Sequence, residues 1–148
     1  MTDEAVWDRV VALHGQVEQE LAKALHRRHG LGLSEYRALR RLAASEQGEL
    51  RMQELADAIG LNQSSVSRLA ARLESEGLAR RDLCPADRRG VYSVITDAGR
   101  DRLAAAEPTY RQTLTLALER AAADPVLGPV VAALRAADSD ALSKARPA

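Results

Sequence analysis

Cysteine is almost absent from this sequence. Cys84 is the only cysteine among 148 residues, so a fold held together by disulfides within the chain is excluded. Long apolar runs are absent too, and none approaches the roughly 18 residues that a membrane-spanning helix needs. The first residues, Met1 to Glu4, are acidic, unlike the basic start of a signal peptide. We therefore expect a globular, cytoplasmic protein that does not associate with membranes.

An excess of positive charge is also lacking. Lysine and arginine together number 21, as do aspartate and glutamate, so the formal net charge is zero. Neutrality counts against nonspecific attachment to nucleic acid, and any basic surface must be local. Such a stretch lies between residues 63 and 72, which hold two arginines and no acid. The hydrophobic fraction of 46% excludes disorder, and the length suits one domain with a real core.

Motifs of the common enzyme classes are missing as well. The chain has no glycine-rich phosphate loop, paired-cysteine motif, nucleophile elbow or metalloprotease helix, so we expect neither catalysis nor a cofactor. His26 and His29 have the spacing of metal ligands, but no cysteine or further histidine lies near them in the sequence. We interpret both as solvated or helix-capping side chains and predict no metal site.

The stretch from 52 to 75 has the pattern of a helix-turn-helix. A short amphipathic segment ends at Gly60, and a second opens after Asn62, whose side chain is suited to cap a helix. The second segment carries one apolar stripe, made of Val66, Leu69, Ala70 and Leu73. Its other faces carry serine and arginine but no acid until Glu74. Because these side chains suit base edges and phosphate oxygens, the pattern favours DNA as the partner.

A hairpin is predicted directly after this segment. Gly77 is suited to end the helix, and strand-like runs at 78–83 and 91–95 follow. The turn between them carries Arg88 and Arg89. A hairpin with arginines at its tip is typical of a wing, which inserts an arginine into a minor groove. Asp87 is placed to orient the guanidinium of Arg89.

These motifs resemble the MarR (multiple antibiotic resistance regulator) family of winged-helix regulators. The resemblance is carried by the runs 65–68 and 73–78, and by an Asp-x-Arg pattern followed at the family's spacing by Thr96 and Gly99, with Ile95 where the family has leucine. It extends upstream to 33–39, and the length matches one family protomer. The implied fold is mainly α with a small β-wing, a winged helix-turn-helix flanked by N- and C-terminal dimerisation helices.

The resemblance and the helical positions together assign the DNA-binding side chains. Near base edges we expect Gln63, Ser64, Ser67 and Arg68. Near phosphates we expect Ser65 and Arg72, with Arg88 as a further contact or an exposed charge. At the tip of the wing, the family pattern places Asp87 and Arg89.

The rest of the chain is predicted to be helical. An apolar repeat predicts a helix over 4–28, and Ser34 is expected to cap the next, which finishes near Ser45 before a turn at 46–49. Thr96 is expected to cap a helix that Pro108 kinks or splits, Asp124 and Pro125 to open the last one, and 143–148 to fray. We assign 1–148 to one domain, with 34–96 as the winged-helix core and with 4–30 and 97–143 as dimerisation helices.

Apolar stripes at both ends of the chain favour a homodimer. Its two-fold axis would present two recognition helices to half-sites about 34 Å apart on double-stranded DNA, in a pseudo-palindromic operator. The resemblance implies release by a small-molecule effector, and repression is the family's commoner mode. Our candidates for the effector pocket are Val17, Leu21, Tyr36 and Arg40.

Two alternatives stay open. A winged-helix scaffold that binds protein instead of DNA would tolerate replacement of Arg68 and Arg89. A thiol switch centred on Cys84 would use neighbouring arginines to lower the thiol pKa. Peroxide would then change DNA affinity, and Cys84→Ser would abolish that change.

Overall fold

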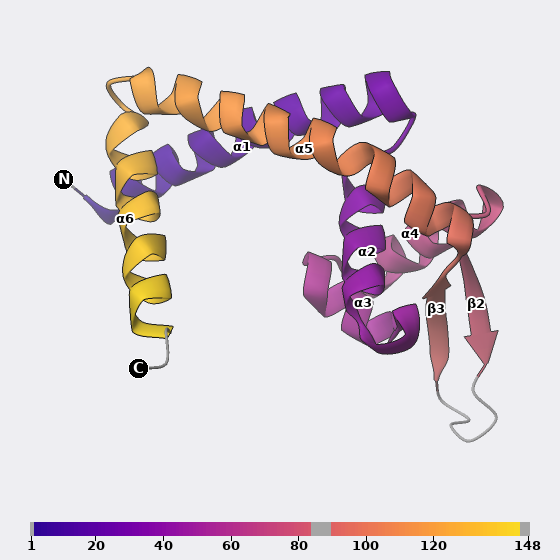
Figure 1. Ribbon diagram of the computed structural model, residues 1–148. Helices are drawn as coiled ribbons and strands as arrows, with labels where there is room; N and C mark the ends of the chain where they lie inside the picture. Colours follow the sequence, from indigo (N-terminus) through magenta and orange to yellow (C-terminus); the bar gives the residue numbers. More distant parts are fainter. Residues whose placement is uncertain (1, 84–89, 146–148) are drawn as a thin grey trace. The chain divides into compact units, whose positions relative to one another are not determined.

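The computed structural model describes residues 2–83 and 90–145 and forms two compact units, which we describe separately. The elements are α1 (Asp3–His29), α2 (Leu33–Ala44), the short 3-10 helix η1 (Glu46–Gly48), β1 (Glu49–Arg51), α3 (Met52–Ile59), α4 (Gln63–Ser75), β2 (Ala79–Leu83), β3 (Val91–Ile95), α5 (Asp97–Ala123) and α6 (Gly128–Ala145) (Figure 1). Within these ranges, no helix combines the length and apolar character needed to cross a membrane.

The unit Ala24–Thr109 contains α2, α3, α4 and a three-stranded antiparallel sheet in the order β1-β3-β2. The two predicted strands pair as a hairpin, with Ala79 opposite Ile95 and Leu83 opposite Val91. The strand β1 was not predicted, because residues 46–49 were interpreted as a turn. That turn exists at Gln47 and Gly48, both with positive φ. The three residues after it pair with β3, and so short a strand has no alternation from which it could be recognised.

The core of this unit follows the predicted apolar stripes. Side chains that are at most 2% exposed come from all three helices, namely Tyr36, Leu39, Leu42, Leu55, Val66, Leu69, Ala70 and Leu73. Burying a leucine side chain contributes about 2 kcal/mol. The buried face of α4 therefore holds the helix to the unit and leaves its polar face outward.

Local signals set the ends of most of these helices. The Asn62 side chain accepts the Ser65 N–H at 2.9 Å, which confirms the predicted cap of α4. Gly60 and Gly77 adopt the left-handed φ that terminates a helix. The cap predicted at Ser34 is wrong. Tyr36 N–H donates to the Gly32 carbonyl at 2.9 Å, so α2 already begins at Leu33.

The helix α5 begins as predicted, but it is not split at Pro108. Thr96 Oγ1 accepts the Gly99 N–H at 3.0 Å, which confirms the predicted cap. Pro108 lies inside a single helix, so the expectation of a split is wrong. A helix survives an internal proline when its packing offsets the one lost hydrogen bond and the ring clash. Thr109, directly after it, is buried.

The other unit consists of residues 1–23 and 110–148. Its core is a cluster of Leu13, Ala121, Leu127 and Val131, with Val17 and Val130 packed against it. Arg120 Nη1 lies 3.0 Å from Glu20 Oε1 and links α5 to α1.

The last helix, α6, begins later and ends later than predicted. Asp124 Oδ1 accepts the N–H groups of Val126 and Leu127 at 2.7 and 3.1 Å. Those bonds close a turn, so α6 starts at Gly128 instead of at Pro125. At its other end α6 runs through Ala145, past the predicted start of fraying at Ser143. The assignment of all residues to one domain stays a prediction.

Candidate nucleic-acid interface

Burial of the apolar face of α4 turns its polar face outward. Because the buried stripe faces the core, Gln63, Ser64, Ser67 and Arg68 are all exposed. Residues one turn apart are neighbours on a helix surface, so these four form one continuous patch. We call them the recognition patch. Four of the predicted DNA-binding residues are therefore brought together on one side of α4.

Hydrogen bonds order the first turn of α4. Asn62 Oδ1 accepts the hydroxyl of Ser64 at 2.9 Å in addition to the Ser65 N–H. Arg68 Nη2 lies 3.5 Å from Ser65 Oγ, one turn earlier. The cap thus holds Ser64, and Ser65 lies beside the guanidinium of Arg68. An ordered donor loses less entropy when it binds a base or a phosphate.

A hollow of about 330 Å³ borders this patch, lined by Gln63 and Ser67 of α4 together with Arg51, Met52, Gln53, Arg81, Gly90 and Val91. Two arginines stand in its wall. Arg51 Nε donates to the Tyr92 hydroxyl at 3.0 Å, and its guanidinium carbon lies 5.6 Å from the centre of that ring. Arg51, Gln53 and Arg81 could not be assigned to the interface from sequence, because the hollow joins segments that are separate in the sequence.

The wing tip lies outside the described residues. That segment contains Asp87, Arg88 and Arg89 as well as Cys84, so the tip contacts and the thiol switch stay predictions. The strands that lead into and out of the tip are in the predicted places. The strand that leads into the tip, β2, carries the basic residues Arg80 and Arg81.

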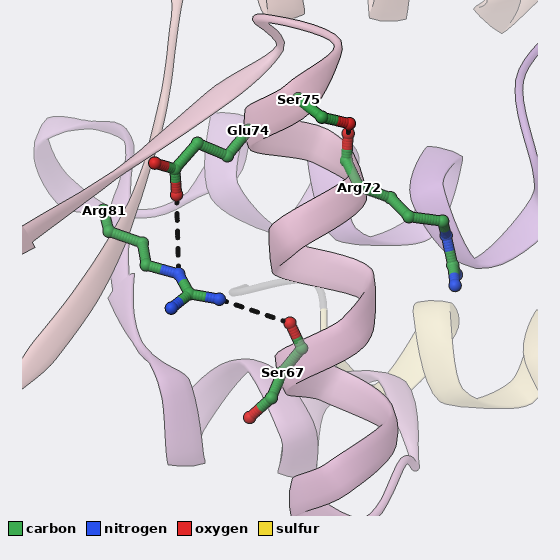
Figure 2. Close-up of polar contacts among 5 residues, drawn as sticks. All are labelled: Ser67, Arg72, Glu74, Ser75 and Arg81. Carbon is green, nitrogen blue, oxygen red and sulfur yellow. Dashed lines mark hydrogen bonds and ion pairs between the residues drawn. The ribbon is translucent and has the colours of Figure 1, made fainter.

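Arg72 lies on another side of α4. Its side chain points away from Ser67 and Arg81 in Figure 2. Its Nε is 3.9 Å from Glu35 Oε1 of α2. The predicted phosphate contact of Arg72 is untested, and in the free protein this arginine neighbours a carboxylate.

Glu35 is a buried carboxyl group at the start of α2. It is 8% exposed, and its Oε2 accepts no hydrogen bond from the part of the chain that the structure describes. Burial raises the pKa of Glu35, and the like charge of Glu76 raises it further, whereas Arg72 and the Gly32 backbone partly oppose this. The balance is unfavourable for the ionised form of Glu35.

We expect Glu35→Gln to stabilise the protein at pH 7. A raised native pKa means that folded Glu35 holds its proton more tightly than the unfolded chain does, so wild-type stability falls as pH rises from about 4.5 through the native pKa. The amide lacks this penalty and brings a donor for Glu76. Urea unfolding at pH 4 and pH 7 measures the difference. A gain that is equally large at both pH values would contradict the assignment to ionisation.

The candidates for the effector pocket are distributed over both units. In the unit of residues 1–23 and 110–148, Val17 packs on the apolar cluster and Leu21 is 1% exposed. In the unit Ala24–Thr109, Tyr36 is 2% exposed in the core, whereas Arg40 is exposed. Their common role stays a prediction.

His29, at the end of α1, has hydrogen-bond partners in α5. His29 Nε2 lies 2.7 Å from Thr109 Oγ1, and Arg102 Nη1 donates to the His29 carbonyl at 3.1 Å. These contacts tie α1 to α5 within the unit Ala24–Thr109. In the ranges 2–83 and 90–145, no group of three or more histidine, cysteine or acidic side chains is placed to hold a metal ion.

A helix-turn-helix followed by a strand hairpin, with a third short strand at its side, defines a winged-helix DNA-binding fold. The sequence model of the MarR family matches residues 29–90. A MarR family transcriptional regulator from Streptomyces coelicolor, solved in complex with DNA, has a TM-score of 0.77 and 29% identity, over 100% of this chain and 92% of that chain. Over residues 29–90 the chain is similar to the MarR family, and it shares the winged-helix fold of these regulators.

Two further solved structures are similar. AbsC, another MarR family regulator from Streptomyces coelicolor, has a TM-score of 0.73 and 27% identity, over 92% of this chain and 97% of that chain. CouR from Rhodococcus jostii RHA1, solved bound to p-coumaroyl-CoA, has a TM-score of 0.62 and 29% identity, over 70% of this chain and 71% of that chain. No curated protein sequence matches this chain.

Proposed function

We propose that this protein is a homodimeric repressor that binds a pseudo-palindromic operator in the cytoplasm and is released by a small-molecule effector. The observation that carries the proposal is the recognition patch. It presents hydroxyl, amide and guanidinium groups on one exposed face of α4, beside a hollow with two arginines in its wall. Such groups read base edges and bind phosphates. The similar regulator from Streptomyces coelicolor that was solved with DNA supports DNA as the partner.

Exposed apolar side chains of the unit formed by residues 1–23 and 110–148 support the homodimer. Trp7 is 65% exposed on α1, Leu116 53% on α5 and Leu134 60% on α6. A contiguous patch of exposed apolar side chains is typical of a surface that another protein covers, and we propose that these three belong to one. A second copy of the chain is the proposed partner, because two-fold symmetry then matches two half-sites about 34 Å apart.

An effector would act by preferring one conformation of the dimer. CouR was solved bound to p-coumaroyl-CoA, and we extend only the general idea of a bound organic molecule to this chain. Release requires that the effector bind more tightly to a conformer whose recognition helices have the wrong spacing. Val17, Leu21, Tyr36 and Arg40 remain our candidates for its pocket.

Arg68→Ala and Arg89→Ala are expected to weaken operator binding by about 10- to 100-fold each, the loss of one base contact or of one arginine in a minor groove. Fluorescence anisotropy of the full chain measures this on DNA from its own upstream region, or on a duplex selected from a randomised pool, against a scrambled duplex across salt concentrations. Wild type should bind selectively and with a steep salt dependence.

Arg135→Ala is the matched control for charge, since Arg135 is an exposed arginine of the other unit. It should leave operator affinity within about twofold of wild type, the scale of a remote screened charge. Light scattering of the same samples tests the homodimer. If wild type selects no duplex from the pool, operator binding is wrong and the protein-binding scaffold becomes the leading function.

A further inference from the structure

We propose that Arg81 is a positioning residue that holds the first strand of the wing against the recognition helix, so that both engage DNA as one body. This inference rests on the proposed DNA-binding function and deepens it. Neither the family pattern nor the apolar stripe assigns a role to Arg81. The assignment comes from two contacts that its guanidinium makes with α4.

Arg81 projects from β2 and bridges two turns of α4. Its Nη2 donates to the carbonyl oxygen of Ser67 at 3.4 Å, and its Nε lies 3.4 Å from Glu74 Oε2 (Figure 2). Positions 67 and 74 are about two helical turns apart, so they lie on the same side of α4. A planar guanidinium that meets an acceptor at each of these points resists both sliding and rotation of the strand along the helix.

The same contacts explain the acid at position 74. Glu74 is the first acidic residue of a helix that is otherwise suited to DNA, and an unpaired carboxylate there would repel phosphates. Arg81 neutralises that charge from the wing. The side chains of Arg81 and Glu74 are 46% and 50% exposed, so the pair is weak in water and worth at most about a fivefold change in an equilibrium. Its contribution is therefore geometric.

The position of Arg81 also connects it with the recognition patch. Ser67 belongs to the patch, and its carbonyl oxygen is one of the two anchors. Arg81, Ser67 and Gln63 line the same hollow. On the other side of the strand, Arg81 is paired in register with Ser93 of β3. A shift of β2 relative to α4 would change the hollow and displace the hairpin that carries the wing tip.

Arg80 provides a matched comparison on the same strand. Successive side chains of a strand point to opposite faces, so Arg80 and Arg81 diverge. Arg80 Nη1 lies 3.6 Å from Asp82 Oδ2, within β2 itself. Arg80→Ala therefore removes the same charge as Arg81→Ala, at almost the same place, without removing a link between strand and helix.

The test measures discrimination between two duplexes with Arg81→Ala, Arg80→Ala and Glu74→Gln in the full chain. The probes are a duplex selected by wild type from a randomised pool and its scrambled version. Arg81→Ala should lower the ratio of the two affinities by about fivefold. Arg80→Ala should weaken both duplexes equally and leave the ratio unchanged, because charge alone does not distinguish sequences.

The direction in which Glu74→Gln changes DNA affinity separates a positioning role from an effect of charge. Removing a negative charge tightens binding to any DNA if only electrostatics matters. If the pair positions the wing, affinity for the selected duplex falls relative to that for the scrambled one. Equal tightening on both duplexes would overturn the proposal, as would an unchanged ratio in Arg81→Ala. Arg81→Lys keeps the ion pair without the second anchor and should lie between wild type and Arg81→Ala.

A second measurement needs no DNA. Hydrogen exchange of the backbone amides of β2 and β3 in the free protein should quicken in Arg81→Ala and Glu74→Gln but not in Arg80→Ala, with circular dichroism showing that each variant is folded. If wild type selects no duplex, operator binding fails while the coupling is still measured. Unchanged exchange in both variants overturns the positioning role. Should Arg81→Ala not fold, Glu74→Gln carries the test.

Discussion

Replacing Gly99 with alanine is expected to lower the free energy of unfolding by about 3 kcal/mol, the upper range for overpacking a site. A Cβ at this position would lie 2.1 Å from the carbonyl oxygen of Leu78 and 2.8 Å from Cγ1 of Ile95. The Leu78 oxygen also accepts the Thr96 N–H at 3.1 Å, so it cannot swing aside without losing that bond. Relief therefore requires the first turn of α5 to move away from the wing.

Gly15→Ala is the matched control, because Gly15 also lies inside a helix but has no atom within 4 Å of its added Cβ. Alanine is the better helix former, and this change should stabilise the protein by about 0.5–1 kcal/mol. Urea unfolding followed by far-UV circular dichroism measures both variants. If Gly99→Ala proved as stable as wild type, the close approach between α5 and Leu78 would be refuted.

Leu69→Ala is expected to destabilise the protein by about 3 kcal/mol through lost burial and the cavity left behind. Leu69 is 0% exposed on the face of α4 that packs against the rest of its unit. Because the same helix carries the recognition patch, loosening its buried side also loosens the placement of the patch. Operator affinity should fall together with stability, although Leu69 itself touches no DNA.

The comparison for Leu69→Ala is Leu83→Ala in the same unit, where the side chain is 73% exposed on β2. Its unfolding free energy should stay within about 0.5 kcal/mol of wild type. Denaturant midpoints compared at equal slope give both values. A cost below about 1 kcal/mol for Leu69→Ala would show that this leucine is not held in a close-packed core.

The recognition helix could be predicted from sequence because its signals are local. The Asn62 cap, the apolar stripe through Leu69 and the stop at Gly77 all lie within one helical segment, and each has a structural counterpart. The strand β1 could not be predicted in this way. It exists because Glu49–Arg51 pairs with Tyr92–Val94 of β3, and such pairing leaves no pattern in three residues.

For Gly99, the sequence indicated that the residue matters but not why. Its spacing from the wing supported the family resemblance, but the resemblance carried no physical reason for it. The reason is the approach of the Leu78 carbonyl, which comes from the far side of the hairpin. The start of α2 was misplaced by two residues, because the backbone hydrogen bond from Tyr36 N–H to the Gly32 carbonyl closes its first turn. The start of α6 was misplaced by three residues, because the Asp124 side chain closes a separate turn before it.

The sequence by itself determined the winged-helix class, the order of its elements apart from β1, and the exposed face of α4, since helical periodicity, caps and turn residues act over a few positions. Only the tertiary structure decided which charges meet. Arg72 lies beside Glu35, and Arg81 lies between Ser67 and Glu74. These neighbours come from different elements, and ion pairs act over a few ångströms in space whatever the separation along the chain.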